Sequence, residues 1–360
     1  MNYKTIADGL MVLENLLSNE LDVDAIIFDC DGTLVDVSES QYLSVKLTSS
    51  IILEKLYGIE IFPGREFDEA IYMLKMLGGF NNMRDIAMLL TQWIFLDIPS
   101  AKMIKDDLGR VDLDEYIAKV TSNETSPKYV RDSLNKLVNW GLNKLGEYVS
   151  KFQLFSLIEH KARELQREQA LKDLRVKLGP RRPYGAGILT TLFSEIYFGS
   201  DEIVKLYGSK PRYVNTPGLI KQDKVIVTED SLQFLDRKVS KGLAIITGRS
   251  RRLTELTLKQ FLKYFRIDAS MFTSDLPEAY EKPSPRVLIE CQEKLGARKV
   301  LYVGDGGEDL FLVKNVIEKG SKALFAGVLT NKFSDKLFPK LEADIIASDV
   351  NRLVELFKKG

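Results

Sequence analysis

Short apolar runs occur once near the start of the chain and repeatedly in its last third. The first run, Ala-Ile-Ile-Phe at residues 25–28, stops at Asp29. Such a run is typical of a buried parallel strand with a polar residue at its carboxyl end. Similar runs follow Lys221, at Leu243–Ile246, Ala269–Thr273, Val300–Val303, Ala323–Val328 and Asp344–Ala347. Helical patterns lie between most of them, which predicts the strand–helix alternation of an open parallel sheet.

From about residue 40 to residue 206, apolar residues recur at helical spacing instead. The first of these patterns is predicted to end at Gly58, and a long amphipathic pattern over Ser126–Leu178 predicts packing within a helical bundle. We therefore predict an α/β domain formed by residues 1–36 and 222–360. It is interrupted after its first strand by an all-helical domain, residues 37–221.

The N-terminal segment Ile6–Leu17 fits an amphipathic helix with Met11 and Leu13 on one face. Asp8, Glu14 and Glu20 interrupt its apolar character, which argues against a signal peptide.

Composition excludes several classes of partner. The 51 basic residues balance 51 acidic ones, so we expect no nucleic-acid partner, and no apolar run reaches bilayer length, so we expect no membrane partner. Cys30 and Cys291 form no spaced pair, which suits a reducing compartment. We expect a cytoplasmic protein. The sequence leaves the oligomeric state open, with a homodimer as one option.

Four short polar segments are predicted to meet at one edge of the sheet. They are Asp29-Cys30-Asp31-Gly32-Thr33, Ile246-Thr247-Gly248-Arg249, Lys282-Pro283-Ser284-Pro285 and Gly304-Asp305-Gly306-Gly307-Glu308-Asp309. Open parallel sheets bind ligands at the carboxyl ends of their strands, where these segments can converge. Together and in this order, they predict a phosphatase with an aspartate nucleophile.

Asp29 is placed to attack phosphorus and form an aspartyl-phosphate. Asp31, two residues on, can protonate the leaving oxygen as general acid and then activate water as general base. Gly32 permits a tight turn that points backbone N–H groups toward phosphate. The structural alternative for this segment is an Asx-type turn with no catalytic role.

The next two segments carry phosphate-binding candidates. Thr247 and Gly248, in the segment that ends at Ser250, open a helix, where a hydroxyl and free N–H groups suit an anion. Thr or Ser ahead of a helix is, however, commonly only an N-cap. Arg249 can contact substrate, but a solvated or ion-paired arginine is the favoured interpretation. Lys282, held by neighbouring prolines, is placed to neutralise charge on the phosphate and the nucleophile.

Asp305 and Asp309 complete a predicted magnesium site. Magnesium prefers oxygen ligands and needs only one or two carboxylates besides phosphate and water. We expect Asp29, the backbone carbonyl of Asp31, and Asp305 to be direct ligands. Asp309 is expected to act through water, and Glu308 is its alternative.

These motifs resemble those of the haloacid dehalogenase superfamily of phosphohydrolases. Asp29 with Asp31 matches its first motif, Thr247 its second, Lys282 its third, and Asp305 with Asp309 its fourth. The resemblance covers about residues 21–36 and 222–350. It implies a magnesium-dependent Rossmann-like domain and a helical cap over the site. The chain is similar in outline to phosphoglycolate-phosphatase-like members, but its cap, at over 180 residues, is much longer than the usual ~80–100.

The leading hypothesis is a phosphatase acting on a small phosphorylated metabolite. Asp31 is decisive, because the superfamily's dehalogenases and phosphonate hydrolases lack an acid at that position. A phosphomutase or phosphotransferase would use the same residues while excluding water from the aspartyl-phosphate. A non-catalytic binding protein would be expected to have damaged motifs, and all four are intact here.

Candidates for substrate recognition lie in the helical segment: Asn81, Asn82, Arg84, Arg181 and Arg182. The ordinary interpretations are helix caps for the asparagines and solvated loop residues for Arg181 and Arg182. His160 is expected at the surface, and Cys30 is expected to pack behind the turn.

Overall fold

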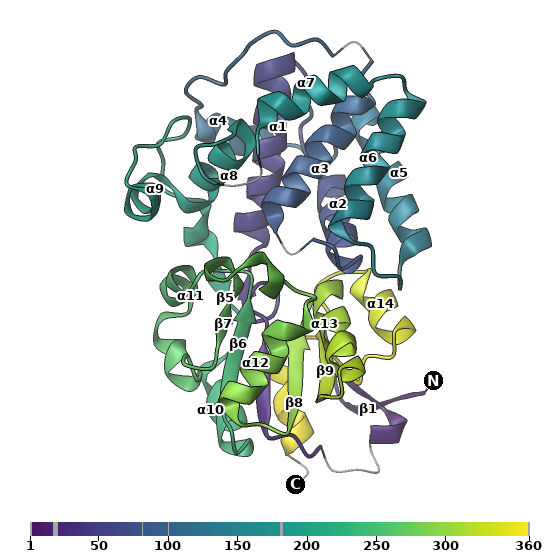
Figure 1. The fold of residues 1–360 in the computed structure, drawn as a ribbon, viewed down its shortest axis with the longest axis vertical. Coiled ribbons are helices and arrows are strands. Elements are labelled where there is room, and N and C mark those ends of the chain that lie inside the picture. Colours follow the sequence, from purple (N-terminus) through teal and green to yellow (C-terminus); the bar gives the residue numbers. More distant parts are fainter. Residues whose placement is uncertain (1, 17–20, 81, 100, 181–182, 359–360) are drawn as a thin grey trace.

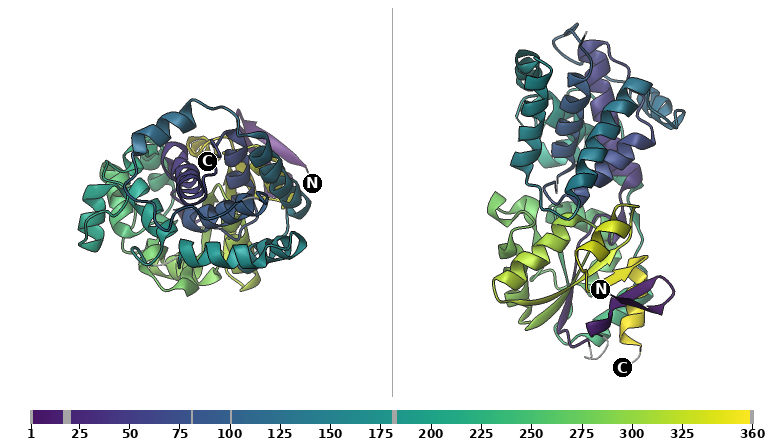
Figure 2. Two further views of the ribbon diagram at one scale, coloured as in Figure 1. Left: turned by 90° about the horizontal axis from the view of Figure 1, so that it is seen from above. Right: turned by 90° about the vertical axis from the view of Figure 1, so that its right-hand side faces the viewer.

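A sheet flanked by helices and an all-helical half lie one above the other in the computed structural model, which describes residues 2–16, 21–80, 82–99, 101–180 and 183–358 (Figure 1). The right-hand view in Figure 2 shows the same division from the side. The arrowheads of the long strands point toward the helical half (Figure 1).

The main sheet has eight strands in the order β1-β2-β10-β9-β8-β3-β6-β7, and the six strands from β10 to β7 pair in parallel. The predicted parallel sheet is therefore confirmed. β3 (Ala25–Phe28) lies at its centre and is buried on both faces, as its unbroken apolar sequence requires. The other parallel strands are β6 (Leu243–Thr247), β7 (Met271–Phe272), β8 (Lys299–Gly304), β9 (Lys322–Val328) and β10 (Ile345–Ala347).

The predicted N-terminal helix is wrong. Residues 3–13 form an antiparallel hairpin of β1 (Tyr3–Ala7) and β2 (Leu10–Leu13), and β2 pairs with β10 at the edge of the sheet. Its two-residue Asp8-Gly9 turn, with Gly9 at φ +71°, is a strong hairpin signal in the sequence. β3 is thus the third strand along the chain and the first of the parallel ones. Leu17, at the end of the predicted helix, lies outside the described residues.

In the described residues, the segment between β4 (Val35–Asp36) and β5 (Lys224–Val225) is confirmed as all-helical. α1 ends at Gly58, which adopts a left-handed conformation as the sequence predicted. The α-helices of the helical half are α1 (Leu43–Tyr57), α2 (Arg65–Met76), α3 (Met83–Leu96), α4 (Leu113–Thr121), α5 (Lys128–Lys144), α6 (Lys151–Glu164), α7 (Glu168–Leu178), α8 (Ile188–Phe198) and α9 (Ser200–Tyr207).

Within the described residues, five further α-helices belong to the sheet half: α10 (Glu229–Lys238), α11 (Arg251–Leu258), α12 (Pro285–Leu295), α13 (Gly307–Glu318) and α14 (Ser334–Lys340). None of the helices in the described part of the chain has the length and apolar character needed to cross a membrane.

Two connections join the halves and run side by side. The chain leaves the sheet half through β4 (Val35–Asp36) and a π-helical turn (Ser38–Tyr42). It returns through a 3-10 helix (Leu219–Gln222) and β5 (Lys224–Val225), which pairs with β4 in an antiparallel ribbon. Both connections therefore pass close to the carboxyl end of β3.

A buried carboxylate organises the returning segment. Glu195 of α8 is fully buried and accepts hydrogen bonds from three consecutive backbone N–H groups, those of Arg212, Tyr213 and Val214, at 2.6, 2.7 and 2.9 Å. This carboxylate satisfies the N–H groups of Tyr213 and Val214, which would otherwise be buried without partners.

We expect Glu195→Ala to lower the free energy of unfolding by about 3 kcal/mol, because it leaves these buried N–H groups unpaired. Urea unfolding followed by circular dichroism measures the change. The control is Glu147→Ala, which removes an exposed pair with Lys144 and should cost less than about 1 kcal/mol. Equal losses in the two variants would contradict this role of Glu195.

Candidate active site

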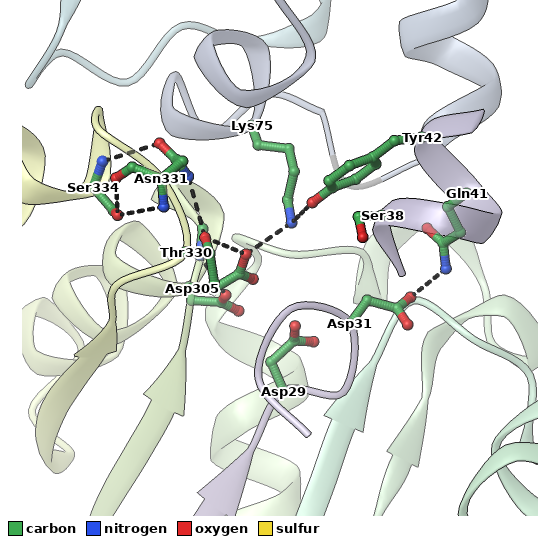
Figure 3. A network of polar contacts seen from close by, with 12 residues as sticks. Asp29, Asp31, Ser38, Gln41, Tyr42, Lys75, Asp305, Thr330, Asn331 and Ser334 are labelled. Carbon is green, nitrogen blue, oxygen red and sulfur yellow. Dashed lines mark hydrogen bonds and ion pairs between the residues drawn. The ribbon is translucent and has the colours of Figure 1, made fainter. Parts of the chain in front are cut away.

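The register of the sheet places Asp29 between the ends of two neighbouring strands. Phe28 pairs with Val303 of β8 and with Ile245 of β6. The Asp29 backbone N–H donates to the Val303 carbonyl at 2.8 Å, which continues the strand pairing by one residue. The chain then turns sharply, and the side chain of Asp29 emerges at the edge that faces the helical half (Figure 3).

Gly32 allows this turn to approach the fourth motif, at Asp305. Its φ is +88°, and a Cβ atom there would lie 2.2 Å from an oxygen of Asp305. Any other residue would therefore be strained in its backbone and would collide with this carboxylate.

Three buried carboxylates form the centre of the site. Asp29, Asp305 and Asp309 each offer an oxygen, and these oxygens lie within 4.8 Å of one another. The Nζ atom of Lys282 is 2.6 Å from Asp29 Oδ1 and 2.7 Å from Asp309 Oδ1, so it bridges the first and last motifs. The structure thus brings together Asp29, Lys282, Asp305 and Asp309, which are up to 280 residues apart in sequence.

The balance of charge at this centre is negative. Asp29, Asp305, Asp309 and Glu308 share two ammonium groups, those of Lys282 and Lys75. Burial raises the pKa of Asp29, against the lowering effect of Lys282, and burial likewise raises the pKa of Asp305. A divalent cation would offset this excess charge and favour the ionised carboxylates.

The donor set fits such a cation. Oδ1 of Asp305 is buried and has no hydrogen-bond partner in the described part of the structure. Asp309, by contrast, is occupied by protein donors: Lys282 and the Tyr302 hydroxyl reach Oδ1, and the Gly306 N–H reaches Oδ2 at 3.1 Å. The role of Asp309 as an indirect ligand stays a prediction. Glu308 is buried but is not one of the three clustered carboxylates.

The second motif lies at the carboxyl end of β6, whose last residue is Thr247. Thr247 is fully buried, and its hydroxyl accepts the Arg249 N–H at 3.1 Å. Ser250, rather than Thr247, caps α11 by accepting the Leu253 N–H. The N-cap interpretation of this segment is therefore confirmed for Ser250 and does not apply to Thr247. Gly248 lies in the wall of a pocket beside Asp31.

Arg249 is ion-paired and buried. Its guanidinium contacts Asp31 at 2.6 Å and Asp223 at 2.8 Å, and it donates to the Thr257 hydroxyl at 2.7 Å. The ion-paired interpretation is confirmed, and the solvated one is wrong. Sequence reasoning missed that its partner is Asp31.

Lys75 is a site residue that the sequence analysis missed. It comes from α2 of the helical half, is buried, and places Nζ 2.9 Å from Asp305 Oδ2 and 3.1 Å from the Tyr42 hydroxyl (Figure 3). The available signal was a lysine within the apolar run Tyr72–Leu77. A charge in such a run needs a buried partner.

A pocket of about 90 Å³ lies between the two halves, with Asp31 in its wall. Asn82 and Arg84 from the start of α3 and Phe193, Tyr197 and Phe198 of α8 line its helical side. Asn82 also caps α3 by accepting the Arg84 N–H at 3.0 Å, as its ordinary interpretation predicted. Asn81, Arg181 and Arg182 lie outside the described residues.

The two remaining sequence candidates are where the ordinary interpretation put them. His160 is exposed and lies 3.3 Å from Glu164, one turn along α6. Cys30 is fully buried within the turn after β3.

Comparison with known proteins identifies the family. The sequence model of the haloacid dehalogenase-like hydrolases matches residues 23–315, so the chain belongs to this family and is a hydrolase. No curated protein has a statistically significant sequence match to this chain. Phosphatase Tt82 from Thermococcus thioreducens has the same fold, with a TM-score of 0.51, 20% identity, and coverage of 92% of this chain and 97% of that one. A structural-genomics target solved by X-ray diffraction gives a TM-score of 0.52 and 19% identity, with the same coverage.

We expect Asp305→Asn to weaken Mg²⁺ binding by about 100-fold, because it removes the carboxylate whose Oδ1 is open to a cation. Isothermal titration calorimetry measures the affinity. Asp344→Asn is the control, since Asp344 is a partly buried acid elsewhere in the sheet half that accepts the Phe325 N–H. An unchanged Mg²⁺ affinity in Asp305→Asn would show that the cation does not use this carboxylate.

Proposed function

We propose that this hydrolase is a Mg²⁺-dependent phosphatase that cleaves a small phosphate monoester through an aspartyl-phosphate on Asp29. One observation carries this proposal. A buried carboxylate at the end of the central strand is paired with Lys282 and lies beside two more carboxylates suited to a cation. A nucleophile, a neutralising lysine and a cation site together are what phosphoryl transfer requires.

In the first step, an oxygen of Asp29 attacks phosphorus and the bond to the leaving oxygen breaks. Asp31 gives its proton to that oxygen, so the leaving group departs as an alcohol. In the second step, water attacks phosphorus and loses a proton to Asp31. The bond from phosphorus to Asp29 then breaks, which releases inorganic phosphate and restores both aspartates.

The phosphoryl group is held by Lys282, the Thr247 hydroxyl, and the backbone N–H groups around Gly32 and Gly248. Lys282 neutralises charge that is shared between Asp29 and the phosphoryl oxygens. Asp29, the carbonyl of Asp31, and Asp305 would hold Mg²⁺, with Asp309 acting through water. When bound, the cation supplies positive charge for the phosphoryl oxygens.

The pocket beside Asp31 accepts the leaving group. Its walls come from both halves, which supports residues 37–221 as a cap domain on a core of residues 1–36 and 222–360. Aromatic side chains and Arg84 line the helical side, so a small leaving group with both apolar and polar parts fits it.

We expect Asp29→Asn to lower kcat at least 1000-fold, because the amide is a poor nucleophile. Phosphate release from 4-nitrophenyl phosphate measures activity, and thermal unfolding checks the fold. Asp24→Asn, just before the opposite end of β3, is the matched control and should keep its activity. Residual activity of Asp29→Asn above one part in a thousand would argue against Asp29 as nucleophile.

Removal of Mg²⁺ with EDTA should abolish phosphate release, and added Mg²⁺ should restore it, because the carboxylate cluster then regains its counter-charge. Full activity in excess EDTA would remove the cation from the mechanism.

A screen of phosphorylated metabolites, with free phosphate as the readout, identifies the substrate. An isomerised sugar phosphate in place of free phosphate would indicate a mutase.

A further inference from the structure

Both carboxylate oxygens of Asp31 are held by neighbours from different parts of the chain. Arg249, at the end of β6, contacts Oδ1 at 2.6 Å. Gln41, in the π-helical turn that leads into the helical half, donates from Nε2 to Oδ2 at 2.8 Å. Figure 3 shows the Asp31 side chain directed toward Gln41.

Arg249 is held in place by residues of the two connections between the halves. Arg249 also pairs with Asp223 at 2.8 Å, and Asp223 accepts the Ser40 hydroxyl at 2.5 Å. Because an arginine stays charged under all ordinary conditions, its guanidinium disfavours a proton on Oδ1 of Asp31. Oδ2 accepts from the neutral amide of Gln41 and is therefore the oxygen that we assign to proton transfer.

The Gln41 side depends on the helical half. Gln41 is buried, and its amide nitrogen also lies 3.4 Å from the Tyr197 hydroxyl on α8. One amide hydrogen therefore faces Asp31 and the other faces Tyr197. A carboxyl oxygen has two acceptor positions, so Oδ2 can accept from Gln41 and still exchange a proton on its other side. Asp31, Gln41 and Tyr197 all line the pocket between the halves.

We propose that Gln41 is a positioning residue, which Tyr197 orients and which directs Oδ2 of Asp31 toward the leaving oxygen in the pocket. This inference rests on the proposed function, in which Asp31 protonates that oxygen. Gln41 belongs to a connection and Tyr197 to the helical half. Asp31 is therefore aligned for proton transfer only while the helical half is packed against the site, with Tyr197 in contact with Gln41.

Leaving groups that differ in their need for a proton test this role. Nitrophenolate leaves as a stable anion, whereas the alkoxide of benzyl alcohol must be protonated as it departs. 4-Nitrophenyl phosphate and benzyl phosphate are otherwise similar in shape. Their kcat/KM values include steps only up to the departure of the first leaving group, so the later use of Asp31 as a base does not enter.

We expect Gln41→Ala to lower kcat/KM for benzyl phosphate by about 10- to 100-fold, and for 4-nitrophenyl phosphate by less than about 3-fold. Asp31→Asn should show the same selectivity with larger losses. Tyr197→Phe, which keeps the ring and removes the hydroxyl, should show a smaller loss confined to benzyl phosphate. Gln41→Met, which keeps the volume, replaces Gln41→Ala if the smaller side chain impairs folding.

The control is Gln92→Ala, which removes a buried glutamine of α3 whose bonds go to the Met88 carbonyl and to Arg175. Both of its kcat/KM values should be unchanged. Equal losses on the two substrates in Gln41→Ala, or no loss on either, would overturn the positioning role while leaving the phosphatase assignment intact. If the unsubstituted protein with Mg²⁺ hydrolysed neither substrate nor any metabolite tested, the proposed function would fail, and this inference with it.

Discussion

The crowding of buried carboxylates at one edge of the sheet is the constraint on which the rest of the site depends. Asp29, Asp305, Glu308 and Asp309 are all nearly inaccessible to solvent. Like charges so close together and so poorly hydrated need cations among them to stay ionised, because burial otherwise raises the pKa of carboxyls such as Asp29 and Glu308 and favours their protonated form. Lys282 from the sheet half and Lys75 from the helical half supply two positive charges, and a divalent cation would supply the remainder.

This requirement links the two halves of the molecule. Lys75 reaches from α2 to Asp305, so the helical half contributes charge to the centre as well as walls to the pocket. Gln41 and Tyr197 extend the link to Asp31. Gly307 allows close approach from the other side, because a Cβ atom there would lie 2.2 Å from the carbonyl oxygen of Met76, at the end of α2. The helical half thus contacts the carboxylate cluster directly, through Lys75, and reaches Asp31 through Gln41.

The parallel strands and the helical ends were predictable because their signals are local. Unbroken apolar runs require burial on both faces of a sheet, and Gly58 ends its helix through its own backbone freedom. The N-terminal hairpin was missed although its signal was also local. The apolar residues of 6–17 also fit a helical face, and only the Asp8-Gly9 turn between two short strands distinguishes the hairpin from a helix.

Sequence alone determined the parallel sheet, the helical insertion and the set of polar residues at the strand ends, because parallel topology brings those ends to one edge. Only the tertiary structure decided which charges are partners. Arg249 pairs with Asp31 across 218 residues because the sheet places the ends of β3 and β6 side by side, and Lys75 pairs with Asp305 across 230 because α2 of the helical half packs over the site. No spacing along the chain encodes this, because a long flexible side chain takes its partner from whatever the packing brings within reach.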